Sequence, residues 1–135
     1  MATKTVRRND LVEPELSYQI VGILYSVFNE MGPGLHEKYY QKAFEEGLKE
    51  SSLPFQAQVG IPLFFRGKLV GRYFADCIVD NKIVVELKKG NAINRRHAVQ
   101  LLAYLKAKKM PLGILAYFGS DGVNFKRLIN LPSNS

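Results

Sequence analysis

The segment Ile83-Val84-Val85-Glu86-Leu87-Lys88 constrains the fold more than any other part of this chain. Its apolar residues run almost without interruption, as in a strand that is covered on both faces, and the tight turn Asp80-Asn81-Lys82 precedes it. Glu86 and Lys88 are two residues apart, so a strand directs both side chains to the same face of its sheet. Ionised groups in such a run are costly to desolvate unless they are paired or bind a metal. We therefore expect a buried central strand that carries a polar site.

Helical and strand patterns surround this segment. Apolar residues recur at helical spacing over 16–31, after a cap offered by Asn9-Asp10, and again over 37–50, with Gly32-Pro33-Gly34 ending the first helix. Gly60 and Pro62 place the strand that contains them at a sheet edge or a bulge. The remaining elements are predicted as strands over 55–65, 69–79 and 83–88, a helix over 95–109, and strands over 112–118 and 123–131.

The order of these elements predicts an α/β fold. A strand, a helix and a second strand near the centre imply a right-handed parallel crossover, so the sheet should be mixed and carry packed helices. The full order is α-α-β-β-β-α-β-β. A length of 135 residues suits one core, and we expect one domain over 1–135, with a loose arm at 1–9 and a frayed tail at 132–135.

Composition narrows the function classes only partly. Nineteen Lys and Arg against twelve Asp and Glu give a charge of +7, which would attract a polyanion, although many solvated surfaces are equally basic. The apolar runs are too short to span a bilayer, and no apolar stretch follows the basic N-terminus as in a secretory signal. Cys77 is the only cysteine, which excludes an internal disulfide and a cysteine-rich zinc site. We expect a cytoplasmic protein without a membrane partner.

Asp76 supplies a second carboxylate near the central strand. It lies ten residues before Glu86, and the short turn between them makes the two strands antiparallel neighbours, so pairing could bring the two carboxylates to one divalent ion. Hard oxygen ligands suit Mg²⁺ or Mn²⁺ and not zinc. Such an ion would polarise a phosphoryl oxygen, and Lys88 would hold the attacking water or stabilise developing charge. Phosphodiester hydrolysis is the expected reaction, and a structural ion pair with Lys88 is the alternative.

Polar residues on the two flanking helices are further candidates. Glu37 lies three residues before Tyr40, so it should begin on the inward face of its helix, or else it complements the helix dipole, worth about 0.3 to 1 kcal/mol. His97, Gln100 and Tyr104 form a polar stripe beside the apolar face of the third helix and should border the cleft. Packing for the tyrosine and capping for the histidine are the alternatives.

Basic residues gather in sequence around the central strand and the third helix, where phosphate contacts would position a polynucleotide. A solvated basic helix is the alternative. The predicted nucleic-acid-binding residues are Lys89, Arg95, Arg96, His97, Tyr104 and Lys108.

Three motifs in this order resemble a known group of enzymes. Asp76, nine intervening residues and Glu86-Leu87-Lys88 resemble the Asp and Glu-x-Lys core of the PD-(D/E)xK nuclease superfamily. The segment Gly34-Leu35-His36-Glu37-Lys38-Tyr39-Tyr40 is similar to the signature of the bacterial GxxExxY family, a branch of that superfamily, and 97–105 is similar to its helix with a Gln and a Tyr-Leu pattern. The resemblance covers about 16–130. Ala75 stands where the superfamily name has Pro, which leaves the metal ligand intact.

The resemblance implies a restriction-endonuclease-like, three-layer α/β/α fold and a Mg²⁺-dependent or Mn²⁺-dependent nuclease that acts on nucleic acid, on DNA more than on RNA, as a homodimer. It implies catalytic roles for Glu37, Asp76, Glu86, Lys88 and Gln100. It also implies a metal held by Asp76, Glu86 and the backbone carbonyl of Leu87, with Glu37 acting through water. Because fold does not fix function, the alternative is a catalytically degenerate nucleic-acid-binding or protein-interaction module on the same fold.

Overall fold

Helices and strands follow one another in the predicted order in the computed structural model, which describes residues 12–131. The helices are α2 (Pro14–Met31), α3 (Glu37–Glu50) and α4 (Arg95–Lys108). The strands are β1 (Phe55–Phe65), β2 (Lys68–Val79), β3 (Ile83–Lys89), β4 (Leu112–Phe118) and β5 (Val123–Ile129).

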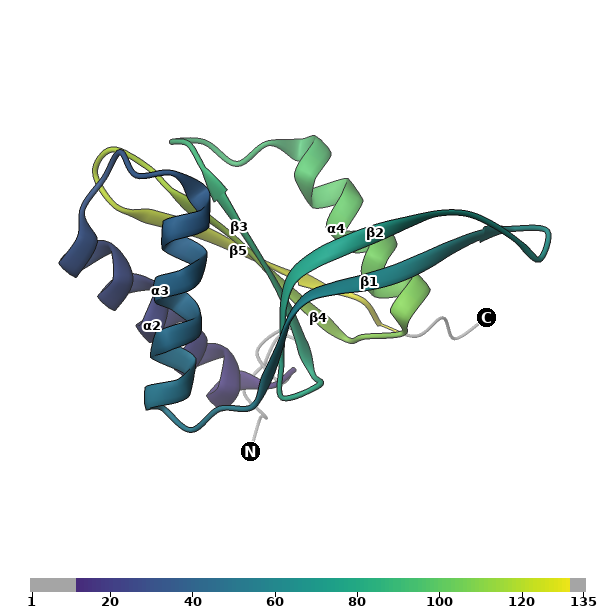
Figure 1. The fold of residues 1–135 in the computed structure, drawn as a ribbon, viewed down its shortest axis with the longest axis horizontal. Coiled ribbons are helices and arrows are strands. Elements are labelled where there is room, and N and C mark those ends of the chain that lie inside the picture. The colour runs from purple at the N-terminus through teal and green to yellow at the C-terminus, as the bar shows by residue number, and fades with distance from the viewer. Residues whose placement is uncertain (1–11, 132–135) are drawn as a thin grey trace, which may run out of the picture.

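The five strands form one mixed sheet in the order β1-β2-β3-β4-β5. β3 and β4 are parallel and are joined by α4, whereas every other neighbouring pair is antiparallel. Helices α2 and α3 cover one face of the sheet and α4 covers the other (Figure 1). The structure therefore confirms the three-layer α/β/α arrangement and the position of β1 at an edge.

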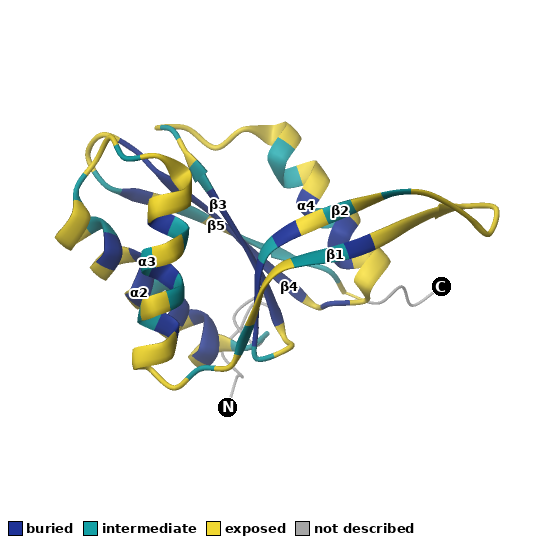
Figure 2. Cartoon of the chain, viewed as in Figure 1, coloured by how far each residue is buried: buried dark blue, intermediate teal, exposed yellow. Residues whose placement is uncertain are grey.

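A separate core lies on each face of the sheet. Residues of α2 and α3, among them Ile20, Leu24 and Phe44, pack on one face, and Leu101 and Leu105 of α4 pack on the other. β3 lies between both cores, and its first five residues are buried (Figure 2). This double burial explains the nearly continuous apolar sequence of the strand.

Several predicted boundaries need correction. β2 begins at Lys68 and β3 ends at Lys89, each one residue beyond its predicted bound. α2 begins at Pro14, a residue suited to the first helical position, with Glu13 at the N-cap, and the predicted cap at Asn9 and Asp10 lies outside the described residues. The third helix ends at Lys108 because Lys109 takes a left-handed conformation with φ 58°. The last strand ends at Ile129, since the side-chain amide of Asn130 donates to the carbonyls of Leu105 and Met110. The predicted terminal segments 1–9 and 132–135 also lie outside the described residues.

Pro33 and its flanking glycines separate α2 from α3 as predicted. Gly32 follows the last residue of α2 with φ +76°, and Gly34 has φ +90°, conformations that favour glycine. Between residues 12 and 131, no helix combines the length and the apolar character needed to cross a membrane.

The β1–β2 hairpin extends well beyond the rest of the sheet (Figure 1). β1 and β2 pair along their whole length, with a register shift between Leu63 and Phe64, whereas β2 pairs with β3 only from Cys77 to Val79. β2 and β3 therefore part just beyond Cys77, at the position of Asp76.

Candidate active site

Where β2 and β3 part, two carboxylates take the place of the backbone hydrogen bonds between the strands. The backbone N–H of Asp76 donates to Oε1 of Glu86 at 2.9 Å, and the backbone N–H of Leu87 donates to Oδ2 of Asp76 at 2.8 Å. Each carboxylate thus satisfies a buried backbone donor that lost its partner strand. The predicted juxtaposition of Asp76 and Glu86 is present in the structure.

One oxygen of each carboxylate remains available. Within residues 12–131, Oδ1 of Asp76 and Oε2 of Glu86 accept no hydrogen bond. The carbonyl of Leu87 faces the same gap, because the N–H and C=O of one residue in an extended strand point to the same side and the N–H of Leu87 points to Asp76. Three hard oxygen donors thus border the point where the strands part.

Burial makes this pair of carboxylates unfavourable as two negative charges. Glu86 is 3% exposed, and burial, followed by the charge of Asp76, raises its pKa from 4.5 to about 7. Burial also raises the pKa of Asp76, although the hydrogen bond from Leu87 and the charge of Lys88 lower it. A bound cation would relieve this cost, which is the electrostatic property expected of a metal site.

Lys88 lies close to both carboxylates without forming an ordinary ion pair. Its charge lowers the pKa of Asp76 and of Glu86. The salt bridges found within residues 12–131 do not include Lys88. The structural alternative of a carboxylate-lysine pair at the strand end is therefore not what holds the two carboxylates in place.

Glu37 reaches the end of β3 from the first turn of α3. Its Oε2 accepts a hydrogen bond from the backbone N–H of Lys89 at 3.1 Å, while Nζ of Lys89 donates to the carbonyl of Gly34 at 3.4 Å. The side chain of Glu37 is exposed, so the prediction that it starts on the inward face of the helix is wrong. Its charge still contributes to raising the pKa of Asp76 and of Glu86, which places it at the edge of the site.

Tyr40 holds the segment before α3 in position. Its hydroxyl donates to the carbonyl of Gly32 at 2.6 Å and accepts from the N–H of Leu35 at 3.2 Å. Its ring stacks on Phe118 of β4 with 4.3 Å between centroids. This residue, buried in the core, thereby fixes the loop that presents Glu37.

Gln41 belongs to the site and was missed by sequence reasoning. Its side-chain amide donates to the carbonyl of Asp76 at 3.0 Å and to Oε2 of Glu45 at 3.2 Å. Glu37, Gln41 and Glu45 are spaced four residues apart, so they share one face of α3. That polar stripe, beside the apolar stripe of Tyr40, Phe44 and Leu48, was the available signal.

The start of α4 is attached to β4 beside Lys88. The hydroxyl of Tyr117, which is paired with Lys88 in the sheet register, lies 2.5 Å from Nδ1 of His97 and accepts from the N–H of Asn94 at 3.0 Å. Burial and the positive charges of Lys88 and Arg96 lower the pKa of His97. The lowered pKa favours the neutral ring, and the contact with Tyr117 attaches the start of α4 to β4.

The other two members of the predicted stripe on α4 differ in environment. Gln100 is exposed and has no hydrogen-bond partner within residues 12–131. Tyr104 is 2% exposed and packs edge-on against Tyr73 with 3.8 Å between ring centroids. The prediction that this residue contacts a polynucleotide is therefore wrong. The hydroxyl of Tyr104 is buried without a hydrogen-bond partner among the described residues, and the charge of Glu86, after burial, raises its pKa.

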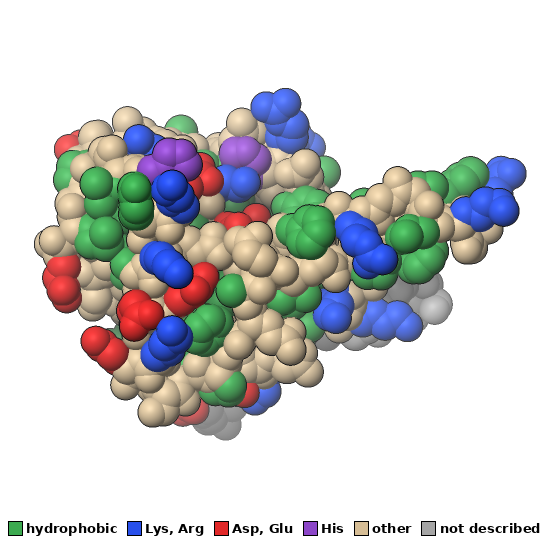
Figure 3. Space-filling model, in the orientation of Figure 1, with side chains coloured by type: hydrophobic (Ala, Val, Ile, Leu, Met, Phe, Trp, Pro, Cys, Tyr) green, Lys and Arg blue, Asp and Glu red, His purple; other side chains and the backbone are tan. Residues whose placement is uncertain are grey.

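The basic residues predicted to contact phosphates are on the surface. Lys89, Arg95, Arg96 and Lys108 are all exposed, the first at the end of β3 and the others at the two ends of α4. Figure 3 shows Lys and Arg side chains around the acidic side chains near the middle of the molecule and along the projecting hairpin. The distribution of charge places cations on the same face as carboxylates.

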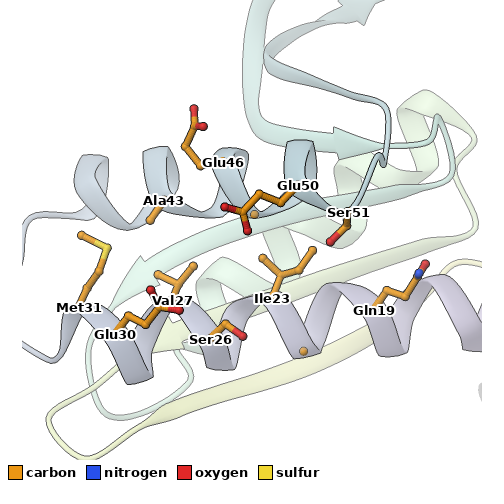
Figure 4. A pocket seen from close by; sticks show the side chains of 12 residues that line it. Gln19, Ile23, Ser26, Val27, Glu30, Met31, Ala43, Glu46, Glu50 and Ser51 are labelled. Atoms are coloured by element: carbon orange, nitrogen blue, oxygen red, sulfur yellow. The ribbon is translucent and has the colours of Figure 1, made fainter.

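A groove of about 630 Å³ lies apart from these carboxylates, between α2 and α3 (Figure 4). Ile23, Val27 and Ala43 are among its apolar lining residues, and Glu30 and Glu46 are among its acidic ones. Acidic side chains repel phosphates, so this groove is unsuited to a polynucleotide.

The donor set around Asp76 fits a hard divalent cation. Within residues 12–131, no three Asp, Glu, His or Cys side chains lie close enough to hold a metal by themselves. Mg²⁺ is commonly bound through one or two carboxylates and keeps several waters, so two carboxylates and one carbonyl meet its requirements. The raised pKa of Glu86 and the oxygens without donors agree with this assignment.

Comparison with known proteins identifies the family of this chain. The family model described as the PD-(D/E)XK nuclease superfamily matches residues 14–128. The crystal structure of SSO0001 is similar to this chain with a TM-score of 0.57 and 20% sequence identity, over 93% of this chain and 61% of that chain, a likeness of fold. No curated protein matches this sequence. With the fold, the paired carboxylates and a family match over most of its length, this chain belongs to the PD-(D/E)XK nuclease superfamily.

Proposed function

We propose that this chain is a Mg²⁺-dependent or Mn²⁺-dependent nuclease that hydrolyses phosphodiester bonds, with DNA as the preferred substrate over RNA. The observation that carries the proposal is the pair Asp76 and Glu86, each with one oxygen held by a backbone N–H and one oxygen without a donor in the described chain. Nuclease chemistry on this fold needs such a pair, because a phosphodiester resists attack until its oxygens are polarised.

Asp76, Glu86 and the carbonyl of Leu87 would hold the metal. The N–H groups of Leu87 and Lys89, which donate to Asp76 and Glu37, are two residues apart, a spacing of about 6.6 Å along a strand. That separation supports a contribution of Glu37 through water. A divalent ion held there supplies Lewis acidity and lowers the pKa of a bound water.

Lys88 would position the attacking water and stabilise negative charge on the phosphate, because its ammonium lies near both carboxylates without a salt bridge in the described chain. Gln100, exposed on α4, would contact the substrate or Lys88. Lys89, Arg95, Arg96 and Lys108 would bind phosphates on either side of the cleaved bond, with neutral His97 as a hydrogen-bonding neighbour.

Membership of the GxxExxY family, the cellular location and the oligomeric state are also part of this proposal. Lys89 of β3 donates to the carboxylate of Glu37 and to the carbonyl of Gly34, and the hydroxyl of Tyr40 donates to the carbonyl of Gly32 in the same loop. These contacts give the Gly-x-x-Glu-x-x-Tyr motif a structural reason and support membership of the GxxExxY branch. The lone cysteine supports action in the reducing cytoplasm. A homodimer would let two such small units engage one duplex.

Cleavage assays with purified protein test the proposal. Labelled single-stranded and double-stranded DNA and RNA are incubated in Mg²⁺, Mn²⁺ or EDTA with the wild type and with Asp76→Asn and Lys88→Ala. We expect cleavage of DNA with either metal, none in EDTA, and a loss of at least about 100-fold in each variant. Glu50→Gln and Lys42→Ala, exposed positions on α3, serve as matched controls that keep wild-type activity.

Cleavage that persists in Asp76→Asn and Lys88→Ala would rule out this site. If no substrate is cleaved and nucleic acid is still bound in EDTA, the degenerate binding module becomes the better description.

A further inference from the structure

The outer part of the β1–β2 hairpin, from Pro62 to Arg72 and called here the arm, has no neighbour from the rest of the described chain to cover it. Every residue of the arm except Gly71 is exposed (Figure 2). The support from α4 ends at Ile61 and Tyr73, which belong to the core on that face of the sheet. The arm is therefore a feature that the stability of the fold does not explain.

Large apolar side chains cover this exposed arm and continue to Phe74, two residues further along β2. Phe64 is 62% exposed, Phe65 59%, Val70 64% and Phe74 56%. Exposed apolar patches of this kind mark surfaces that bind a partner. The arm thus carries the composition of a binding surface.

The positive charge of the arm indicates a polyanionic partner. None of the twelve Asp and Glu residues lies between residues 51 and 75, whereas Arg66, Lys68 and Arg72 are all in the arm. The guanidinium of Arg66 lies 4.8 Å from the centre of the Phe65 ring. Cations interleaved with exposed aromatic rings match the phosphates and the base faces of an unpaired strand. Two arms from two copies of the chain would instead bring like charges together.

The arm leads directly into the candidate active site. Tyr73 packs against Tyr104 of α4, so the alternation of a strand turns Arg72 and Phe74 to the opposite face. The ring of Phe74 covers Gly60, where a Cβ would lie only 2.9 Å from Cε1 of Phe74. Asp76 follows two residues later on the same strand, and Figure 3 shows apolar and basic side chains alternating along the arm on the face that displays the central acidic groups.

We infer that the arm, together with Phe74 beside it, binds unpaired nucleotides of the substrate, so that a strand held on Phe64 and Phe74 by base stacking and on Arg66, Lys68 and Arg72 by its phosphates leads into the site at Asp76. The delivery of the bound strand to Asp76 for cleavage rests on the proposed nuclease function. The binding of the strand to the arm does not require cleavage. It predicts a preference for substrates with a single-stranded segment beside the bond that is cut.

Binding in EDTA separates the arm from catalysis. Fluorescence anisotropy measures the affinity of the full-length protein for a 20-nucleotide single-stranded DNA and for the duplex of the same sequence. We expect tighter binding to the single strand, and a loss of at least about fivefold in single-strand affinity for each of Phe64→Ala and Phe74→Ala. Arg72→Ala weakens single-strand binding and reduces its salt dependence.

Two exposed residues on the helices provide matched controls. Tyr18→Ala removes an aromatic side chain that is 81% exposed on α2, and Lys42→Ala removes a cation on α3, and both should bind like the wild type. Thermal unfolding of each variant confirms that it is folded.

Three results would overturn the inference: equal single-strand affinity of arm and control variants, an equal loss of duplex and single-strand affinity in the aromatic variants, or a change of oligomeric state in the arm variants with unchanged DNA binding. The last outcome would assign the arm to contact with a second copy. If the protein binds single strands through the arm but cleaves no substrate, the proposed function is wrong and the inference about the arm stands. If the protein cleaves nucleic acid but the arm variants bind single strands like the wild type, the proposed function stands and the inference about the arm is wrong.

Discussion

Asp76 and Glu86 each have a structural role and, in the proposed function, a chemical one. Each uses one carboxylate oxygen to satisfy a backbone N–H that the parting of β2 and β3 leaves without a partner. The other oxygen accepts no hydrogen bond within residues 12–131. We therefore expect substitution at either position to change stability as well as the proposed activity. Amide variants, which retain an oxygen acceptor, isolate the effect of charge.

The raised pKa of Glu86 predicts how stability depends on pH without metal. Folding raises this pKa from 4.5 to about 7, so between these values the folded protein keeps a proton that the unfolded chain has released. In EDTA the free energy of unfolding should therefore fall as the pH rises from about 4.5 to about 7, by at most about 3 kcal/mol. Urea unfolding at pH 5 and pH 8 measures the difference. Glu86→Gln should flatten the dependence, and an unchanged slope in that variant would show that other groups cause it.

Two tyrosines near the site should respond oppositely to loss of the hydroxyl. The Tyr104 hydroxyl has no hydrogen-bond partner in the described chain, so Tyr104→Phe should leave the free energy of unfolding unchanged or raise it by up to about 1 kcal/mol. The Tyr117 hydroxyl contacts both Asn94 and His97, so Tyr117→Phe should lose about 1 to 2 kcal/mol. Chemical denaturation of the two variants checks this, and a large loss in Tyr104→Phe would show that its hydroxyl has a partner.

At the level of single elements, α3 shows how much of the site could be predicted from sequence. Its bounds and its apolar stripe followed from periodicity, because burial against the sheet imposes a regular spacing. Glu37 was predicted on the wrong face, since a first-turn residue can reach β3 from the exposed side. Gln41 was missed because its partner is a backbone carbonyl on another strand, and such a contact leaves no sequence pattern.

Two glycines on the facing helices offer a test of how closely α2 and α3 pack. A Cβ at Gly47 of α3 would lie 2.5 Å from Cγ2 of Ile23, whereas a Cβ at Gly22 of α2 would meet nothing within 4 Å. Gly47→Ala should therefore lower the free energy of unfolding by about 1 to 3 kcal/mol despite the higher helix propensity of alanine. Gly22→Ala, the matched control, should raise it by up to about 1 kcal/mol. Stabilisation by both substitutions would mean that the helices are less closely packed.

On the scale of the whole molecule, the site arises because β2 belongs both to the buried part of the sheet and to the projecting arm. β2 pairs with β3 near the turn, where both strands are buried, and then leaves it to form the arm with β1. The sequence predicted the hairpin, the crossover and the nearness of Asp76 to Glu86, since turns and periodicity are local. It did not predict where the strands part, because that depends on how the twisted hairpin packs on Tyr104 of α4. The candidate active site and the arm both follow from this divergence.

Diffraction from crystals soaked in Mn²⁺ tests most directly whether the parted ends of β2 and β3 form a metal site. We expect an anomalous difference peak between the carboxylates of Asp76 and Glu86, beside the carbonyl of Leu87, and its loss in Asp76→Asn crystals treated in the same way. A wild-type crystal with no peak between these carboxylates at saturating Mn²⁺, or with manganese bound only elsewhere, would show that the two carboxylates do not form a metal site.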